Sequence, residues 1–426
     1  MVKYGCSKCG KDFKQKSHYD RHMNKKNPCI QENKLAEIIN NAVERKIIEL
    51  QNEYFDKIDS EKEFLNEIDT EDEDNFLDEA DFLDESEDES EDESEDKSED
   101  ESEDESIDKL NALDLFCGCG GMSKGLTDAG INIIAGIDYW DKAVESYKKN
   151  NTHIGICADL TKLPPEEFQK KYNHKNKKID IIVGGPPCQG MSIAGKRDIK
   201  DPRNSLFMEY VKYLNYYNPK AFIMENVMGI LSMKNANGEK IIDIVMGFFN
   251  KNYNCVICKL YASDFEVPQN RRRVIIIGIR KDLKIIPTEP KSVLSESTRI
   301  PVKNILLPKD KIDKSYYLSE KAITGIKNKK IKALENKNGF GAQYLDLNKP
   351  SYTIPARYWK DGYDALVKYN ETEIRRLTIL ELKRIQSFPD DYILEGSKKD
   401  QIMQIGNAVA CRFAYHLGKH LMKILQ

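Results

Sequence analysis

Two reactive side chains follow directly after short apolar runs of the sequence. Cys188 lies in the string GGPPCQG (184–190), which follows the apolar run IDIIV, and Glu225 opens the string ENV (225–227) after KAFIM. A lone cysteine in such a place is more often a buried structural residue. A carboxylate at a neighbouring strand end favours the catalytic interpretation, because both side chains would project into one crevice. A thiol nucleophile beside an acid suits attack on an electron-poor ring.

A glycine-rich segment predicts a nucleotide-like ligand upstream of these residues. The string DLFCGCGG (114–121) has the strand–loop–helix form that lets backbone amides approach such a ligand. It lacks the GxGxxG fingerprint, so the loop alone is weak evidence. Asp138 stands 24 residues after Asp114, at the end of the next apolar run. An acid at that position binds ribose hydroxyls in related folds.

The N-terminal thirty residues have the spacing of a zinc finger. Two cysteines separated by two residues are followed, after twelve residues, by a histidine and, after six more, by a third cysteine. Phe13 and Tyr19 occupy the places of a finger's two core apolar residues, whereas His18 comes too early to be a ligand. The alternative is a disordered basic leader. The predicted zinc ligands are Cys6, Cys9, His22 and Cys29.

Composition and periodicity divide the chain into six predicted segments. Residues 1–30 form the predicted finger and 31–58 an amphipathic helix that could bind a protein partner. Residues 59–108 form a disordered acidic linker. Apolar runs alternate with helical stretches over 109–280, which predicts an α/β fold with a mostly parallel sheet covered on both faces. The Lys-rich, irregular 281–372 predicts a second, smaller lobe, and helical patterns return in 373–426.

The charge distribution points to a polyanionic partner. The formal net charge of the 426 residues is -5, but 59–108 alone hold 29 acidic residues against two lysines. Residues 1–58 carry a net charge of +4, so the net charge of 109–426 is about +18. The acidic linker is then either a solvated spacer or a competitor of that partner for the basic domain. No apolar run reaches the roughly 20 residues of a membrane helix, and the N-terminus has no apolar signal core. Membrane and secretory classes are therefore excluded.

A series of motifs resembles the DNA (cytosine-5)-methyltransferases. DLFCGCGG, GIDYW, CADL, GGPPCQGMS, ENV, QNRRR, RRLTILELKRIQSFPDDY and QIGNAVA occur in this order and cover essentially all of 109–426. The resemblance implies a Rossmann-like fold that uses S-adenosylmethionine, with a small target-recognition domain inserted at 281–372. It implies that Cys188 adds to carbon 6 of a flipped cytosine, and that Glu225 holds ring nitrogen 3 and the amino group. The further implied catalytic residues are Asn226, which supports the Pro-Cys loop, and Gln269, Arg271 and Arg273.

The same resemblance implies a cofactor pocket. Asp138 would bind the ribose and Asp159 the adenine amino group. The sequence departs from the family pattern at Tyr139, where tryptophan is common, and at Met191, where phenylalanine is usual; neither change removes a reactive group. The implied pocket residues are Asp114, Phe116, Gly118, Gly120, Asp138, Tyr139, Asp159, Leu160, Pro187 and Asn407.

We therefore expect a monomeric catalytic unit that methylates double-stranded DNA, as in restriction-modification, in the nucleus or another DNA-containing compartment. A non-catalytic nucleic-acid-binding regulator is the alternative from another class, although no reactive residue is missing. RNA is the alternative substrate, but the Cys-Phe-Thr string of the tRNA-modifying branch is absent.

Overall fold

The computed structural model divides into two units, Met1–Asp100 and Glu101–Gln426. It describes residues 4–6, 12–13, 15–23, 109–173, 175–186, 206–234, 238–336, 342–360 and 362–426. The predicted helix at 31–58 and the acidic linker at 59–108 lie outside the described residues. So do Cys9, Cys29, Pro187, Cys188 and Met191.

The larger unit is built on a seven-stranded sheet with the order β5-β4-β3-β6-β7-β9-β8. The first five strands in this order are parallel, and β9 pairs antiparallel with both β7 and β8. The prediction of a mostly parallel α/β sheet is confirmed. The strands are β3 (Asn111–Leu115), β4 (Asn132–Asp138), β5 (Ile154–Cys157), β6 (Ile181–Gly184), β7 (Ala221–Val227), β8 (Tyr253–Tyr261) and β9 (Arg272–Arg280).

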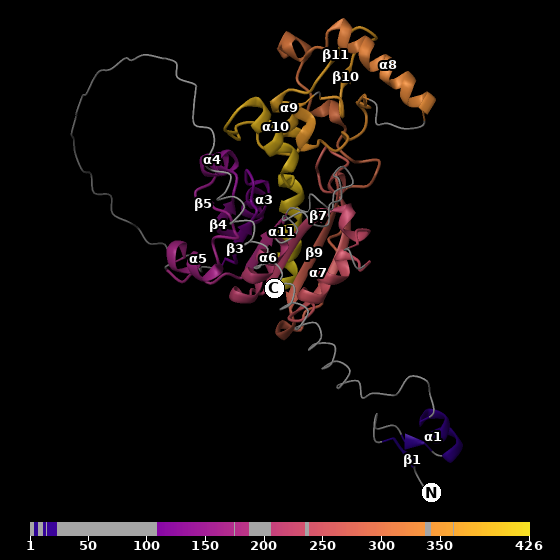
Figure 1. Cartoon of the computed structure of the whole chain (residues 1–426). Coiled ribbons are helices and arrows are strands. Elements are labelled where there is room, and N and C mark those ends of the chain that lie inside the picture. The colour runs from indigo at the N-terminus through magenta and orange to yellow at the C-terminus, as the bar shows by residue number, and fades with distance from the viewer. Residues whose placement is uncertain are drawn as a thin grey trace, which may run out of the picture. The chain divides into compact units, whose positions relative to one another are not determined.

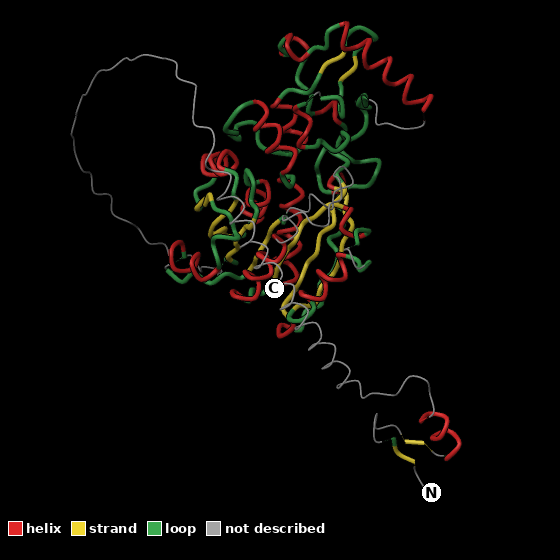
Figure 2. The backbone as a smooth tube through the Cα atoms, viewed as in Figure 1, coloured by secondary structure: helices red, strands yellow, loops and turns green. Residues whose placement is uncertain are grey.

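Helices cover both faces of this sheet, which explains why its strands read as nearly continuous apolar runs. On one face, α3 (Gly121–Ala129) and α11 (Cys411–Leu425) share an apolar core with the strands. On the other face the core is completed by α5 (Pro165–Tyr172), α6 (Leu206–Tyr217) and α7 (Ile241–Phe249). Helix α4 (Asp141–Asn150) packs against β4 and β5. Figures 1 and 2 show this layered arrangement.

The segment predicted as a smaller lobe, 281–372, contains α8 (Glu320–Asn336) and β10 (Val367–Lys368). Strand β10 pairs antiparallel with β11 (Ile374–Arg375), after which α9 (Ile379–Ile385) and α10 (Lys398–Asn407) follow in 373–426. Residues of both segments share two further apolar cores. One core includes Val302, Ile354 and Leu382, and another includes Leu318 and Ile374. Helix α11 then returns the chain to the sheet (Figure 1).

The N-terminal unit contains a hairpin followed by a helix. Strands β1 (Tyr4–Gly5) and β2 (Asp12–Phe13) pair antiparallel, and α1 (Lys16–Met23) follows them. The Phe13 ring lies 4.8 Å from the His22 ring and 6.2 Å from the Tyr19 ring, centroid to centroid. Cys6 is buried and His18 is exposed. The described part of the N-terminal unit is therefore a small ββα arrangement.

No helix among the described residues is long and apolar enough to cross a membrane.

A fully buried ion pair joins β11 to α9. Arg375 donates to both carboxylate oxygens of Glu381 at 2.8 Å, and both side chains have no exposed surface. Glu381 also accepts from the backbone N–H of Thr378, whose hydroxyl accepts from the Glu381 N–H in return. This capping box begins α9. Arg375 therefore ties the start of the helix to the β10–β11 hairpin.

Removing one partner of this pair should be strongly destabilising. We predict that Glu381→Gln lowers the free energy of unfolding by about 3–5 kcal/mol, because it leaves the buried Arg375 guanidinium uncompensated. Urea unfolding followed by circular dichroism measures the loss. Asp282→Asn is the matched control, since it breaks the exposed Arg280–Asp282 pair and should leave the transition unchanged. Equal effects of the two variants would contradict the prediction.

Candidate active site

The glycine-rich loop between β3 and α3 is held against the end of β4 by one carboxylate. Asp138 accepts the backbone N–H of Gly118 at 2.8 Å on one oxygen and that of Trp140 at 2.9 Å on the other. Burial raises the pKa of the Asp138 carboxyl, and the backbone hydrogen bonds oppose that shift. The loop and the carboxylate predicted to bind the ribose thus form one hydrogen-bonded unit.

A second carboxylate, that of Asp114 on β3, is hydrogen-bonded to Ser123 in the helix that follows the loop. Asp114 is 1% exposed and accepts a hydrogen bond of 2.7 Å from the Ser123 hydroxyl, which lies 3.0 Å from the Tyr147 hydroxyl. The Tyr147 ring in turn covers Gly136, where an added Cβ would lie 2.3 Å from the ring. Burial raises the pKa of Asp114 to about 7. Asp114 is therefore placed to support the loop through Ser123.

The other described pocket residues lie at the carboxyl ends of the parallel strands or in the loops that follow. Tyr139 follows β4 and is 72% exposed, which leaves its ring available for stacking. Asp159 follows β5, and one of its oxygens accepts from both the N–H and the hydroxyl of Thr161. Leu160 is buried and Phe116 half-buried, while Asn407 is exposed at the end of α10.

The carboxyl ends of β6 and β7 carry the second group of predicted residues. Arg273 donates from Nε to Oε1 of Glu225 at 2.7 Å, and only about an eighth of each side chain is exposed. An added Cβ on Gly185 would lie 3.3 Å from Oε2 of the same carboxylate. Asn226 donates to the carbonyl of Pro186 at 3.3 Å. Gly185 and Pro186, which lead into the segment that carries Cys188, therefore lie beside Glu225 and Asn226.

Gln269 and Arg271 form hydrogen bonds with residues that come much later in the chain. The Gln269 amide donates to Oε1 of Gln386 at 3.0 Å and accepts from the Ile354 N–H at 3.0 Å. Arg271 donates to the carbonyl of Gly406 at 3.1 Å, next to Asn407, and burial lowers its pKa to about 9. Gln269 and Arg271 thus link the start of β9 to later segments.

Comparison with known proteins identifies the family. Residues 110–423 match the family described as C-5 cytosine-specific DNA methylase. The chain belongs to this family. The type II methyltransferase M.DdeI of Desulfomicrobium norvegicum is 32% identical over 378 residues, which cover 73% of this chain and 88% of the relative. M.FnuDI of Fusobacterium nucleatum is 34% identical over 348 residues, with 74% and 95% covered.

Solved structures of methyltransferases share the fold. A DNA modification methyltransferase encoded within a prophage (E. coli) matches with a TM-score of 0.58 and 25% identity, covering 74% of this chain and 99% of that one. The Spodoptera frugiperda DNMT2 structure matches with a TM-score of 0.56 and 22% identity, covering 74% and 99%. The predicted enzyme class, transfer of a methyl group from S-adenosylmethionine to carbon 5 of cytosine, is confirmed by the family.

Sequence reasoning missed several residues that hold the methylase site together. Ser123 and Tyr147 support Asp114, and the Tyr392 hydroxyl donates to the carbonyl of Cys119 at 2.5 Å, across 273 residues of chain. No spacing rule connects such partners, because each pair meets only through the packing of separate elements. The Thr378–Glu381 capping box was readable in the sequence as a threonine followed three residues later by glutamate.

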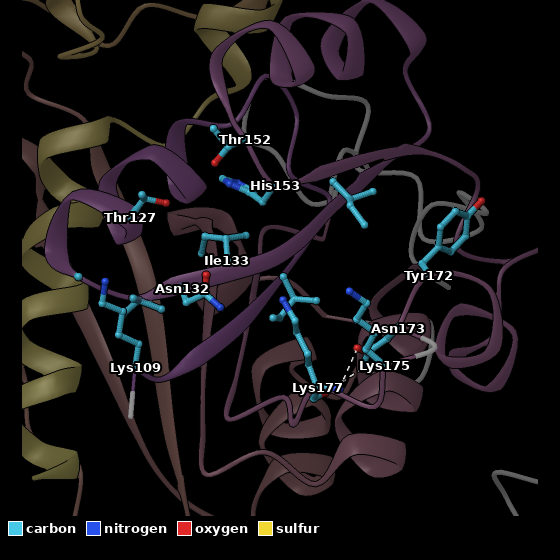
Figure 3. Close-up of a pocket in the computed structure, with 14 residues that line it drawn as sticks. Lys109, Thr127, Asn132, Ile133, Thr152, His153, Tyr172, Asn173, Lys175 and Lys177 are labelled. Atoms are coloured by element: carbon cyan, nitrogen blue, oxygen red, sulfur yellow. Dashed lines mark hydrogen bonds between the residues drawn. The ribbon is translucent and has the colours of Figure 1, made fainter. Parts of the chain in front are cut away.

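A cavity of about 500 Å³ lies at the opposite edge of the methylase sheet (Figure 3). It opens around the amino ends of β3, β4 and β5, and its described lining includes Lys109, Asn132, His153 and Lys177. The Nε2 of His153 has no hydrogen-bond partner among the described residues, and burial lowers its pKa to about 4. This cavity is separate from the edge that carries Asp138 and Glu225.

The pKa of Asp114 leads to a prediction about stability and pH. A carboxyl whose folded pKa is raised from 3.8 to about 7 stabilises the fold below its unfolded pKa, and this contribution is lost as pH rises through 7. The free energy of unfolding should therefore fall between pH 5 and pH 8 by on the order of 2–3 kcal/mol more in the wild type than in Asp114→Asn. Urea titrations of both proteins at the two pH values measure the difference. An identical pH dependence would show that Asp114 is ionised throughout.

Proposed function

We propose that this methylase acts on cytosine in double-stranded DNA through a covalent adduct with Cys188. The observation that supports the proposal is the Glu225–Arg273 pair beside Gly185, three residues before Cys188. Gly185 directly follows β6, and Glu225 lies near the carboxyl end of β7, the neighbouring parallel strand. A thiol carried by that loop would therefore reach the same ligand as the Glu225 carboxylate.

The proposed reaction uses each group in turn. The Cys188 thiolate adds to carbon 6 of the cytosine, which makes carbon 5 nucleophilic. Glu225 holds ring nitrogen 3 and the amino group, and Arg273 fixes the carboxylate through Oε1. Bound S-adenosylmethionine supplies the methyl group. Loss of the carbon 5 proton to a base then expels the Cys188 thiolate and restores the aromatic ring.

The described residues fit such a cofactor. The glycine-rich loop, Asp138, Tyr139 and Asp159 all lie at the carboxyl ends of β3, β4 and β5, where nucleotides bind in open α/β sheets. In this proposal Asp138 binds the ribose, Asp159 the adenine amino group, and Tyr139 stacks on the adenine. Asp114 supports the glycine-rich loop through the buried hydrogen bond from Ser123, whereas Gln269 and Arg271 donate to Gln386 and Gly406.

The substrate in this proposal is duplex DNA, from which the target base must be flipped out at a cost of about a few kcal/mol. The designation of the relatives as type II methyltransferases supports a role in modification of DNA. A tritium-transfer assay with duplex DNA and with tRNA distinguishes this substrate from RNA. A monomeric catalytic unit and a partner for 31–58 stay predictions.

Substitution of the nucleophile is the direct test. We predict that Cys188→Ala abolishes methyl transfer but retains S-adenosylmethionine binding, because the proposed cofactor residues lie mainly on other strand ends. Tritium transfer and isothermal titration calorimetry measure the two properties. Cys255→Ala is the matched control, since it removes a half-buried thiol from β8 outside the site.

A mechanism-based substrate adds a second measurement to this test. Duplexes with 5-fluorocytosine should trap a covalent adduct, since fluorine at carbon 5 blocks the final elimination. The adduct should form with the wild type and with Cys255→Ala, and should be absent with Cys188→Ala. Methyl transfer by the wild type without any adduct would mean that Cys188 is not the nucleophile.

We also propose that residues 1–30 bind one structural zinc ion. Support comes from the ββα arrangement, from the contact of Phe13 with His22, and from the burial of Cys6. Cys6, Cys9, His22 and Cys29 would hold the ion, and the metal would supply the folding energy that thirty residues lack. The described residues alone contain no cluster of three or more metal-binding side chains, because Cys9 and Cys29 lie outside them.

The zinc content of two variants distinguishes the predicted ligand His22 from the nearby His18. We predict one zinc per chain, retained in His18→Ala, whose histidine is exposed, and lost in His22→Ala, whose histidine packs on Phe13. Atomic emission spectroscopy of the purified proteins measures the stoichiometry. Zinc that persists in a chain beginning at residue 109 would place the site elsewhere.

A further inference from the structure

We propose that Arg272, stacked on Tyr261 beside Arg299, binds a backbone phosphate of the DNA next to the target cytosine. This inference rests on the proposed function, since it assigns a contact to that substrate. It concerns a group outside the predicted catalytic set, which includes Arg271 and Arg273 but not the residue between them. The three side chains, Tyr261, Arg272 and Arg299, are called the arginine–tyrosine cluster below.

The strand order places this cluster at the catalytic edge. Tyr261 ends β8 and pairs directly with Arg272, the first residue of β9. Because β9 is antiparallel to β7 and β8, its amino end lies at the same edge as the carboxyl end of β7, which carries Glu225. Successive strand residues point to opposite faces. Arg273 therefore reaches Glu225, while Arg272 is directed to the other side of the strand.

The charges of the cluster are incompletely balanced. The guanidinium carbons of Arg272 and Arg299 lie 5.2 and 5.6 Å from the centroid of the same Tyr261 ring. Arg299 is compensated by Asp264, whose carboxylate accepts from its Nε at 2.7 Å. Among the residues that the structure describes, Arg272 forms no ion pair. One exposed positive charge is thus held at this edge against the same ring as Arg299, without a carboxylate of its own among the described residues, and an anion would compensate it.

A phosphodiester is the anion that suits this geometry. A guanidinium is planar and offers paired N–H donors that match two phosphate oxygens, and stacking on an aromatic ring leaves these donors free while limiting side-chain motion. Preorganisation of this kind reduces the entropy lost on binding. Phosphate contacts also position a duplex without reading its sequence. The cluster would therefore set the position of the target strand beside Glu225.

The other arginines near β9 show why Arg272 differs. Arg271 is 3% exposed and bonded to Gly406, and Arg273 is paired with Glu225. Arg280, at the far end of β9, is paired with Asp282. Arg280 therefore provides a control on the same strand, with the same change of charge, at the edge away from the proposed DNA.

The salt dependence of DNA binding tests the assignment. For Arg272→Gln we expect duplex affinity at low salt to fall about tenfold or more, and the slope of log K against log salt to decrease by about 1, the loss of one phosphate contact. Arg272→Lys should keep the slope, because it keeps the charge. Arg280→Gln should match the wild type in affinity and slope. Thermal unfolding of each variant checks that the fold is intact.

Kinetics and a modified duplex separate this role from a structural one. Arg272→Gln should raise the KM for DNA while kcat and S-adenosylmethionine binding stay unchanged. In a duplex carrying the mapped methylation site, a neutral methylphosphonate at one phosphate flanking the target should weaken wild-type binding but should not weaken Arg272→Gln further. An unchanged slope in Arg272→Gln, or equal sensitivity of both proteins at every flanking position, would overturn the inference. A wild type that transfers no methyl group to any duplex would instead overturn the proposed function on which it rests.

Discussion

The antiparallel insertion of β9 between β7 and β8 is the constraint on which the catalytic edge depends. A strand that ran parallel to its neighbours would carry Arg273 to the opposite edge of the sheet. Reversal of its direction brings Arg273 to Glu225 instead, and only about an eighth of each side chain is exposed, so the ion pair is largely shielded from solvent. The same reversal brings Arg272 to Tyr261 and Arg271 to Gly406. Three consecutive arginines thus acquire three different environments.

At the carboxyl ends of β3 and β4, two carboxylates hold the glycine-rich loop and the residues around it. Asp138 accepts from Gly118 and Trp140, and Asp114 accepts from Ser123. Both carboxyls have raised pKa values because burial disfavours their charged forms. Such groups are costly to bury, so their hydrogen bonds must be satisfied with well-defined geometry. The loop conformation at β3–α3 follows from that requirement.

The C-terminal elements complete the site although they are remote in sequence. Gln386, directly after α9, accepts a hydrogen bond from Gln269 and donates one to the carbonyl of Ile405 in α10. Tyr392 reaches the carbonyl of Cys119 in the cofactor loop. These contacts run between the glycine-rich loop, the start of β9 and the helices that follow the smaller lobe. Residues 373–426 therefore support segments that carry predicted site residues far from them in the sequence.

The fold class and the reactive residue types could be predicted from local sequence patterns. Apolar runs alternating with helical stretches indicated a mostly parallel sheet, because strands covered on both faces leave that pattern. The residues that follow the strands were readable for the same reason: parallel strands bring their carboxyl ends to one edge, so Asp138 and Glu225 were expected there. The spacing of Cys6 and His22 is also a local property; the structure has a ββα arrangement there, and the zinc ion stays a prediction.

The hydrogen-bond partners of the buried side chains depend instead on how separate elements pack together. Asp114 was expected in the cofactor pocket, yet it is buried against Ser123, because the depth of a strand residue depends on helices packed later. QNRRR predicted roles for Arg271 and Arg273 but did not indicate the partner of any of its arginines, since Gly406, Tyr261 and Glu225 come from separate parts of the chain. Spacing along a sequence reports periodicity within an element. The partners of a buried polar group are set by the packing between elements, which no local pattern encodes.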